Sequence, residues 1–134
     1  GPGIASGKQS RALCYLFDLY PTICELVGVD VPRSVEGRSL AGVLKGKQTS
    51  ARDSLMGAYR DVQRMVRTDD WKLISYPKVG RTQLFHVAED PHELTNLADD
   101  PRHQQRREHL EALLLKSQHQ YDDPLLKSPF APRK

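Results

Sequence analysis

The chain has 134 residues, of which 38% are hydrophobic and 28% charged, so its composition is that of a globular protein and excludes wholesale disorder. Its 20 Lys and Arg residues against 17 Asp and Glu give a net charge of +3, too weak and too interleaved to predict nucleic-acid binding. No apolar run reaches the roughly 18 residues of a membrane span, and no signal-peptide pattern opens the chain.

The first 46 residues are expected to form a glycine-rich loop and two helices. Apolar residues recur at helical spacing over residues 12–28, with Pro21 in the first turn and Gly28 as a left-handed stop. This segment is apolar on nearly every side, which predicts protein contacts on several faces. A shorter helix is expected at residues 39–45, before Gly46.

Four short runs with strand character follow, at residues 54–59, 63–68, 71–76 and 82–87. The short connections between them suit antiparallel hairpins. Asp100 and Pro101 then predict the start of a long helix over residues 101–121. Its apolar stripe is expected to cover the sheet and contains Leu110, Leu113, Leu114, Ser117 and Tyr121. The predicted fold class is α+β: a four-stranded antiparallel sheet packed by a long C-terminal helix and preceded by one or two helices.

These elements predict three regions, at residues 1–46, 47–123 and 124–134. The last is a short tail that is basic at its end, with Leu125, Leu126 and Phe130 as its apolar anchors.

Three segments together resemble the C-terminal region of the sulfatases, of the arylsulfatase and choline-sulfatase type, in the alkaline phosphatase superfamily. Residues 37–40 match the step "dGrSL", residues 63–74 resemble "rmvRtdryKli", and residues 83–98 resemble "eLydlenDPhEltNLa". His86 departs from the Asp that is usual in the family. The resemblance implies that residues 1–46 are the end of a catalytic α/β domain and that residues 47–123 form the closing subdomain.

Sulfatases are understood to use a formylglycine, made from Cys or Ser in a C/S-x-P-x-R motif, and a divalent cation, usually calcium. The resemblance places both in the missing catalytic domain, because neither Cys14 nor Cys24 is followed by the required proline and arginine. We therefore expect no catalytic residue, cofactor or metal in this chain, and no activity from it alone. The family is often periplasmic or secreted, but the sequence leaves the compartment open.

Several residues have competing interpretations. Cys14 and Cys24 are expected as buried free thiols, with a disulfide as the alternative. The five histidines lack the spacing of metal ligands, and residues 90–96 are expected to form a capped turn, although an acid/base site could be built from the same residue types. Arg60, Gln63 and Arg64 flank the first hairpin turn and are the candidates for the rim of a substrate cleft, with solvated charges as the alternative.

The sequence favours a sulfatase fragment with a structural and cleft-forming role, whose partner is the missing catalytic domain. Exposure of the apolar helix at residues 13–27 would then promote a homo-oligomer, with a disordered N-terminal segment as the alternative. The alternative is a free-standing interaction module that binds a protein or an anionic glycan. A small independent hydrolase is disfavoured, since no paired nucleophile and base motif is present.

Overall fold

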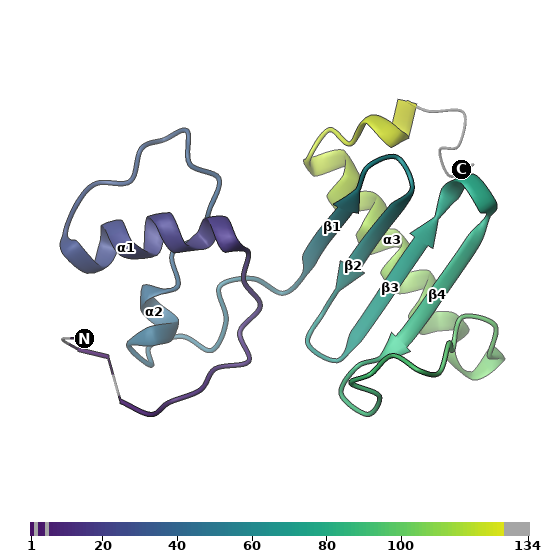
Figure 1. The fold of residues 1–134 in the computed structure, drawn as a ribbon, viewed down its shortest axis with the longest axis horizontal. Coiled ribbons are helices and arrows are strands. Elements are labelled where there is room, and N and C mark those ends of the chain that lie inside the picture. The colour runs from purple at the N-terminus through teal and green to yellow at the C-terminus, as the bar shows by residue number, and fades with distance from the viewer. Residues whose placement is uncertain (2, 5, 128–134) are drawn as a thin grey trace. The chain divides into compact units, whose positions relative to one another are not determined.

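The computed structural model describes residues 1, 3–4 and 6–127. The chain divides into two compact units, Gly1–Leu55 and Met56–Lys134 (Figure 1). The assignment of residues 1–46, 47–123 and 124–134 to regions of a sulfatase stays a prediction. Phe130, one of the expected anchors of the tail, lies outside the described residues. No helix within the described ranges is both long enough and apolar enough to cross a membrane.

The N-terminal unit contains a 3-10 turn, Leu16–Asp18, and two helices, α1 (Leu19–Val27) and α2 (Ala41–Leu44). The helix expected from residue 12 begins only at Leu19. Pro21 lacks a backbone N–H and therefore fits only in the first turn of a helix, which sets this start. Gly28 ends α1 with φ of 76°, as predicted.

The C-terminal unit carries the predicted four-stranded antiparallel sheet, in the order β1-β2-β3-β4. Its strands are β1 (Leu55–Tyr59), β2 (Gln63–Arg67), β3 (Trp71–Tyr76) and β4 (Arg81–His86). In the antiparallel register, Val66 of β2 lies opposite Leu73 of β3, which in turn lies opposite Leu84 of β4. These three side chains are fully buried on one face of the sheet.

The long helix α3 (Gln104–Gln120), entered through a 3-10 turn at Pro101–His103, covers that face (Figure 1). Leu110 and Leu114 pack on the three strand residues, and Asp100 accepts the Arg102 N–H at 2.9 Å as the predicted cap. The α+β prediction is confirmed. Tyr121 does not extend the stripe: it is 44% exposed, because the helix ends there and Asp122 turns the chain with φ of 47°.

A second, smaller cluster forms from Ile74, Phe85 and Val87, with Met65 and Tyr76 packed against it. Ile74 follows Leu73 in β3, and successive strand residues point to opposite faces. The sheet therefore buries apolar side chains on both faces. The chain ends its described part in a 3-10 turn, Pro124–Lys127, which buries Leu125.

Candidate functional site

The hairpin between β1 and β2 carries the three cleft-rim candidates, and the structure separates them. Arg60 lies in the turn with φ of 47°, and its side chain is exposed beside the ring of Tyr59. Gln63, the first residue of β2, is half-buried, whereas Arg64 is only 4% exposed. Of the two candidate arginines, the hairpin therefore presents Arg60 to solvent and turns Arg64 inward.

The buried Arg64 forms a two-pronged ion pair with Asp123, which follows α3. Nε and Nη2 donate to the two carboxylate oxygens at 2.6 and 2.7 Å. Nη1 donates to the backbone carbonyls of Arg60 and Gln63 at 2.6 and 2.8 Å. One guanidinium therefore fixes the hairpin turn and ties it to the end of α3.

Asp123 is satisfied on both carboxylate oxygens. Beyond Arg64, it accepts hydrogen bonds from Gln118 Nε2 at 2.8 Å and from the Leu125 N–H at 3.1 Å. The Arg64 guanidinium is the main cause that lowers the pKa of Asp123 to about 2, against the opposing effect of burial. The sequence shows Asp123 only as a turn residue before Pro124, so its role as a buried partner was missed.

Asp61 of the hairpin turn forms an exposed ion pair with Lys78 of the connection between β3 and β4. The Lys78 hydrogen bond, the largest cause, lowers the pKa of Asp61. This pair leaves Arg60 as the hairpin's exposed guanidinium, and none of the described ion pairs contains it. The hairpin can thus bind an anion, but it holds no acid and base arranged for proton transfer.

A second buried ion pair organises the N-terminal unit. Asp18 has no exposed surface and pairs with Arg52. Its carboxylate also accepts the backbone N–H groups of Tyr15 and Arg38 at 2.7 and 2.8 Å. Burial acts to raise the pKa of Asp18, but these donors outweigh it and hold the pKa below its usual value. Asp18 therefore joins the start of α1 to the "dGrSL" step at residues 37–40.

Residues 90–98 form the turn expected from the sequence. Asn96 Oδ1 accepts the N–H groups of Leu84 and Ala98 at 2.9 and 3.1 Å, which fastens the turn to the edge of β4. Asp90 accepts the Thr95 N–H at 2.9 Å, and backbone N–H groups, that of Thr95 first, lower its pKa. These side chains are occupied by local backbone, which supports a structural role for the turn.

Cys24 is buried as expected, whereas Cys14 is exposed, and both are free thiols. Cys14 lies in the extended segment before the 3-10 turn, outside the helix that was expected to bury it. Within the part of the chain that the structure describes, no three His, Cys, Asp or Glu side chains are placed to hold a metal ion. The described residues therefore do not fit a calcium site, which requires several oxygen ligands.

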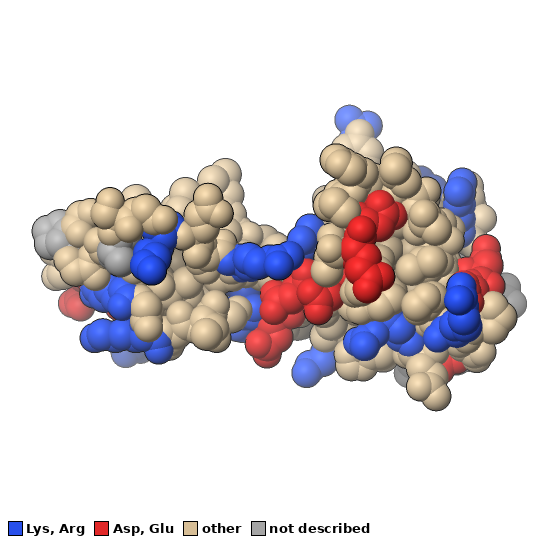
Figure 2. Space-filling model, turned by 90° about the horizontal axis from the view of Figure 1, so that it is seen from below, with Lys and Arg blue, Asp and Glu red and all other residues tan. Residues whose placement is uncertain are grey.

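On the face drawn in Figure 2, basic and acidic side chains lie interspersed over the C-terminal unit. Such a surface lacks the single-signed stripe that is typical of nucleic-acid-binding proteins.

The family model for the C-terminal region of N-sulphoglucosamine sulphohydrolase matches residues 2–120. The chain belongs to this sulfatase C-terminal family. It is 30% identical over 132 residues to an N-acetylglucosamine-6-O-sulfatase of Bacteroides thetaiotaomicron, covering 90% of this chain and 24% of the relative. It is 29% identical over 113 residues to an arylsulfatase of Clostridium perfringens, covering 82% and 24% of the two chains.

Solved structures agree with this assignment. A 2-O GAG sulfatase matches with a TM-score of 0.81 and 30% identity, covering 95% of this sulfatase region and 30% of that chain. A phosphonate monoester hydrolase of Silicibacter pomeroyi matches at a TM-score of 0.75 but only 23% identity, and so shows the shared fold alone. The chain spans about a quarter of the curated sulfatases it matches.

Proposed function

We propose that this chain is the part of a sulfatase that completes the catalytic domain and borders its substrate cleft. The observation that carries the proposal is the apolar face of α1 and the turn before it. Leu16, Ile23 and Val27 are 84%, 59% and 67% exposed. Contiguous exposed apolar surface of this kind marks an interaction site. The opposite side of α1 already buries Thr22 and Cys24 against its own unit.

The partner that fits this face is the remainder of the sulfatase. The matched relatives are about four times longer than the stretch they share with this chain, since that stretch is 24% of each. The Asp18 network fixes the start of α1, so the apolar face is preformed and needs no folding on contact. In the absence of the remainder, the same face is expected to pair with a second copy of the chain.

The cleft-bordering role falls on Arg60, with Gln63 beside it. Arg64 holds the backbone of both residues and leaves the Arg60 guanidinium free to meet an anionic group. A sulfate ester is the substrate class. Two relatives are named for sulfated sugars, the N-acetylglucosamine-6-O-sulfatase and a Delta 4,5-hexuronate-2-O-sulfatase of Bacteroides thetaiotaomicron, which supports a sugar sulfate. Formylglycine and calcium would be supplied by the remainder of the protein.

The test compares the chain alone with the longest protein that its coding region encodes, using 4-nitrophenyl sulfate as substrate. We expect turnover from the longer protein, loss of turnover when residues 56–127 are deleted from it, and no turnover by the chain alone. Hydrolysis by the isolated chain, or full activity of the deleted protein, would contradict the proposal.

A second candidate is an interaction module that folds and binds on its own, to a protein or an anionic glycan. One relative favours it: in an uncharacterized protein of Haemophilus influenzae, 29% identical over 118 residues, the match takes up 60% of the relative. A stable monomer of the isolated chain with tight ligand binding would support this candidate over the first.

A further inference from the structure

A hollow of about 340 Å³ lies beside the first turns of α3. Its lining consists of Trp71, Arg102, His103, Gln105, Arg106 and His109. No Asp or Glu belongs to this described lining, and of its two guanidinium groups that of Arg102 is paired with Asp100.

The Trp71 ring contacts two of the side chains that line this hollow, His103 and Arg106. The same ring stacks on the imidazole of His86, with 4.4 Å between centroids and 24° between planes. The His103 ring lies tilted at 5.3 Å, and the guanidinium carbon of Arg106 lies 5.3 Å from the Trp71 ring. Guanidinium groups are attracted to the face of an indole. Arg106 is therefore oriented by the ring and not by a carboxylate.

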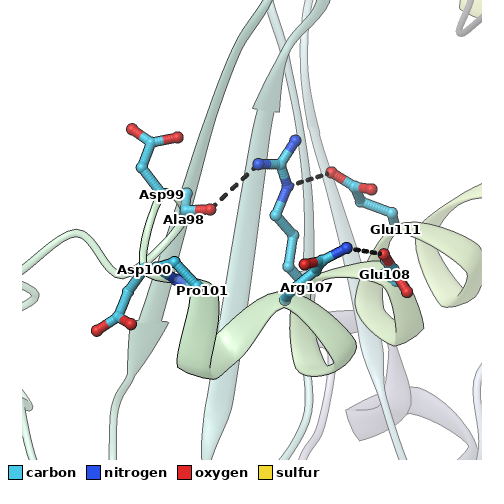
Figure 3. A pocket seen from close by; sticks show the side chains of 8 residues that line it. Ala98, Asp99, Asp100, Pro101, Arg107, Glu108 and Glu111 are labelled. Carbon is cyan, nitrogen blue, oxygen red and sulfur yellow. Dashed lines mark hydrogen bonds and ion pairs between the residues drawn. The ribbon is translucent and has the colours of Figure 1, made fainter.

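A second hollow lies on the other flank of α3, and its arginine is paired with a carboxylate. A hollow of about 400 Å³ there is lined by Ala98, Pro101, Gln104 and Arg107 together with the carboxylates of Asp99, Asp100, Glu108 and Glu111. Arg107 donates to Glu111 at 2.9 Å and to the Ala98 carbonyl at 3.1 Å (Figure 3). This flank is acidic, and its arginine, Arg107, is bound by a carboxylate and a backbone carbonyl.

Arg106 differs from both of its neighbouring arginines. Arg102 binds Asp100 at 2.6 Å, and Arg107 binds Glu111. Among the described ion pairs, none contains Arg106. One guanidinium with free donors therefore faces a hollow that it shares with His109 and His103.

We propose that this hollow, here called the Trp71 hollow, binds the sulfate group of a sulfated saccharide. The planar guanidinium of Arg106 donates two parallel hydrogen bonds to the oxyanion, the arrangement in which arginine binds such groups best. His109 and His103 supply further N–H donors. The oxyanion site rests on this geometry alone, whereas the choice of a sulfated saccharide rests on the proposed function.

The experiment titrates the purified chain with a heparin hexasaccharide by calorimetry and repeats the titration with the chemically desulfated hexasaccharide. We expect binding of the sulfated form only, weakened roughly ten-fold or more by Arg106→Gln. Lys116→Gln is the matched control, because it removes one positive charge from an exposed position on the same helix. It should change the dissociation constant by less than about two-fold, which corresponds to a screened surface charge.

Three results would overturn the proposal: unchanged binding by Arg106→Gln, equal weakening by both variants, or equal binding of the desulfated saccharide. Inorganic sulfate should displace the hexasaccharide if the contact is to an oxyanion, and failure to displace it also counts against the site. A 12-nucleotide single-stranded DNA that binds as tightly would overturn the assignment to a saccharide. None of these measurements involves turnover, so they are independent of the sulfatase assay.

Discussion

The two units of the chain differ in what their large apolar side chains face. In the C-terminal unit, Val66, Leu73, Leu84 and Leu110 are fully buried between the sheet and α3. In the N-terminal unit, α1 leaves most of its large apolar residues exposed, and a charged side chain, the carboxylate of Asp18, is among the residues without exposed surface.

This contrast is what the proposed function expects of a unit with its own core joined to a unit whose apolar face the remainder of a sulfatase would cover. Each uses a buried Asp–Arg pair, but only the C-terminal pair, Arg64 with Asp123, sits beside a hydrophobic core. Buried ion pairs give specificity more than stability, so the N-terminal pair fixes a shape without supplying much folding energy.

Asp123→Ala should destabilise the C-terminal unit by about 3–5 kcal/mol, because it leaves the buried Arg64 guanidinium without its partner. Urea unfolding followed by circular dichroism measures the loss. Asp122→Asn is the matched control, since Asp122 is exposed and Asn tolerates the left-handed turn; its effect should stay within about 0.5 kcal/mol. A cost below about 1 kcal/mol for Asp123→Ala would mean that the pair is not buried in solution.

Leu110→Ala should cost about 2–5 kcal/mol, because Leu110 is fully buried against β-strand residues. Leu115→Ala, on the exposed side of the same helix, should cost less than about 1 kcal/mol. Equal costs at the two positions, measured by the same unfolding experiment, would show that α3 packs in a different rotation.

Acid should weaken the C-terminal unit between about pH 4 and pH 2. The pKa of Asp123 is about 2 in the folded unit, and an unfolded Asp has a pKa of about 3.9. The unfolded state therefore binds more protons in this window, and about 2–3 kcal/mol of stability, fully present above pH 4, is lost as the pH falls through 2.

Urea unfolding at several pH values measures this loss. The pKa of Asp100 is also lowered to about 2, mainly by the Arg102 side chain, so it contributes a pH dependence of the same sign. The double variant Arg64→Met with Asp123→Leu removes the Asp123 contribution and leaves that of Asp100 in place. If the double variant and the original chain lost stability with pH in the same way, the acid-induced loss would not come from Asp123.

Arg60→Gln should leave stability unchanged within about 0.5 kcal/mol, because its side chain is exposed on the hairpin. In the longer protein it should raise KM for an anionic substrate while kcat changes little, as removal of a binding contact does. Arg33→Gln, an exposed arginine of the other unit, serves as the control. Identical KM values for Arg60→Gln and the unmodified protein would remove Arg60 from the cleft.

The strands and α3 were predictable from local patterns. The alternation of side chains between two faces predicts β3, and Asp100 with Pro101 predicts the start of α3. Neither prediction needs information from distant residues. The inward position of Arg64 was also available: it lies two residues before Val66 in β2 and therefore shares its face.

The two ion pairs were not predictable, because their partners lie far apart in the sequence. Arg52 and Asp18 are 34 positions apart, and Arg64 and Asp123 are 59 apart. No helical or strand period links residues at such separations. The Trp71 hollow was missed for the same reason, since Trp71 of β3 lies far in the sequence from the lining residues of the Pro101–His103 turn and α3.

The molar mass of the isolated chain, measured by sedimentation velocity over a concentration series, tests most directly whether α1 presents a binding face. With an uncovered α1 face, the chain should form dimers or larger species, and Ile23→Ser combined with Val27→Ser should return it to a monomer without loss of helix content. A monomer at every concentration, unaffected by the two serines, would contradict the claim that α1 presents a binding face.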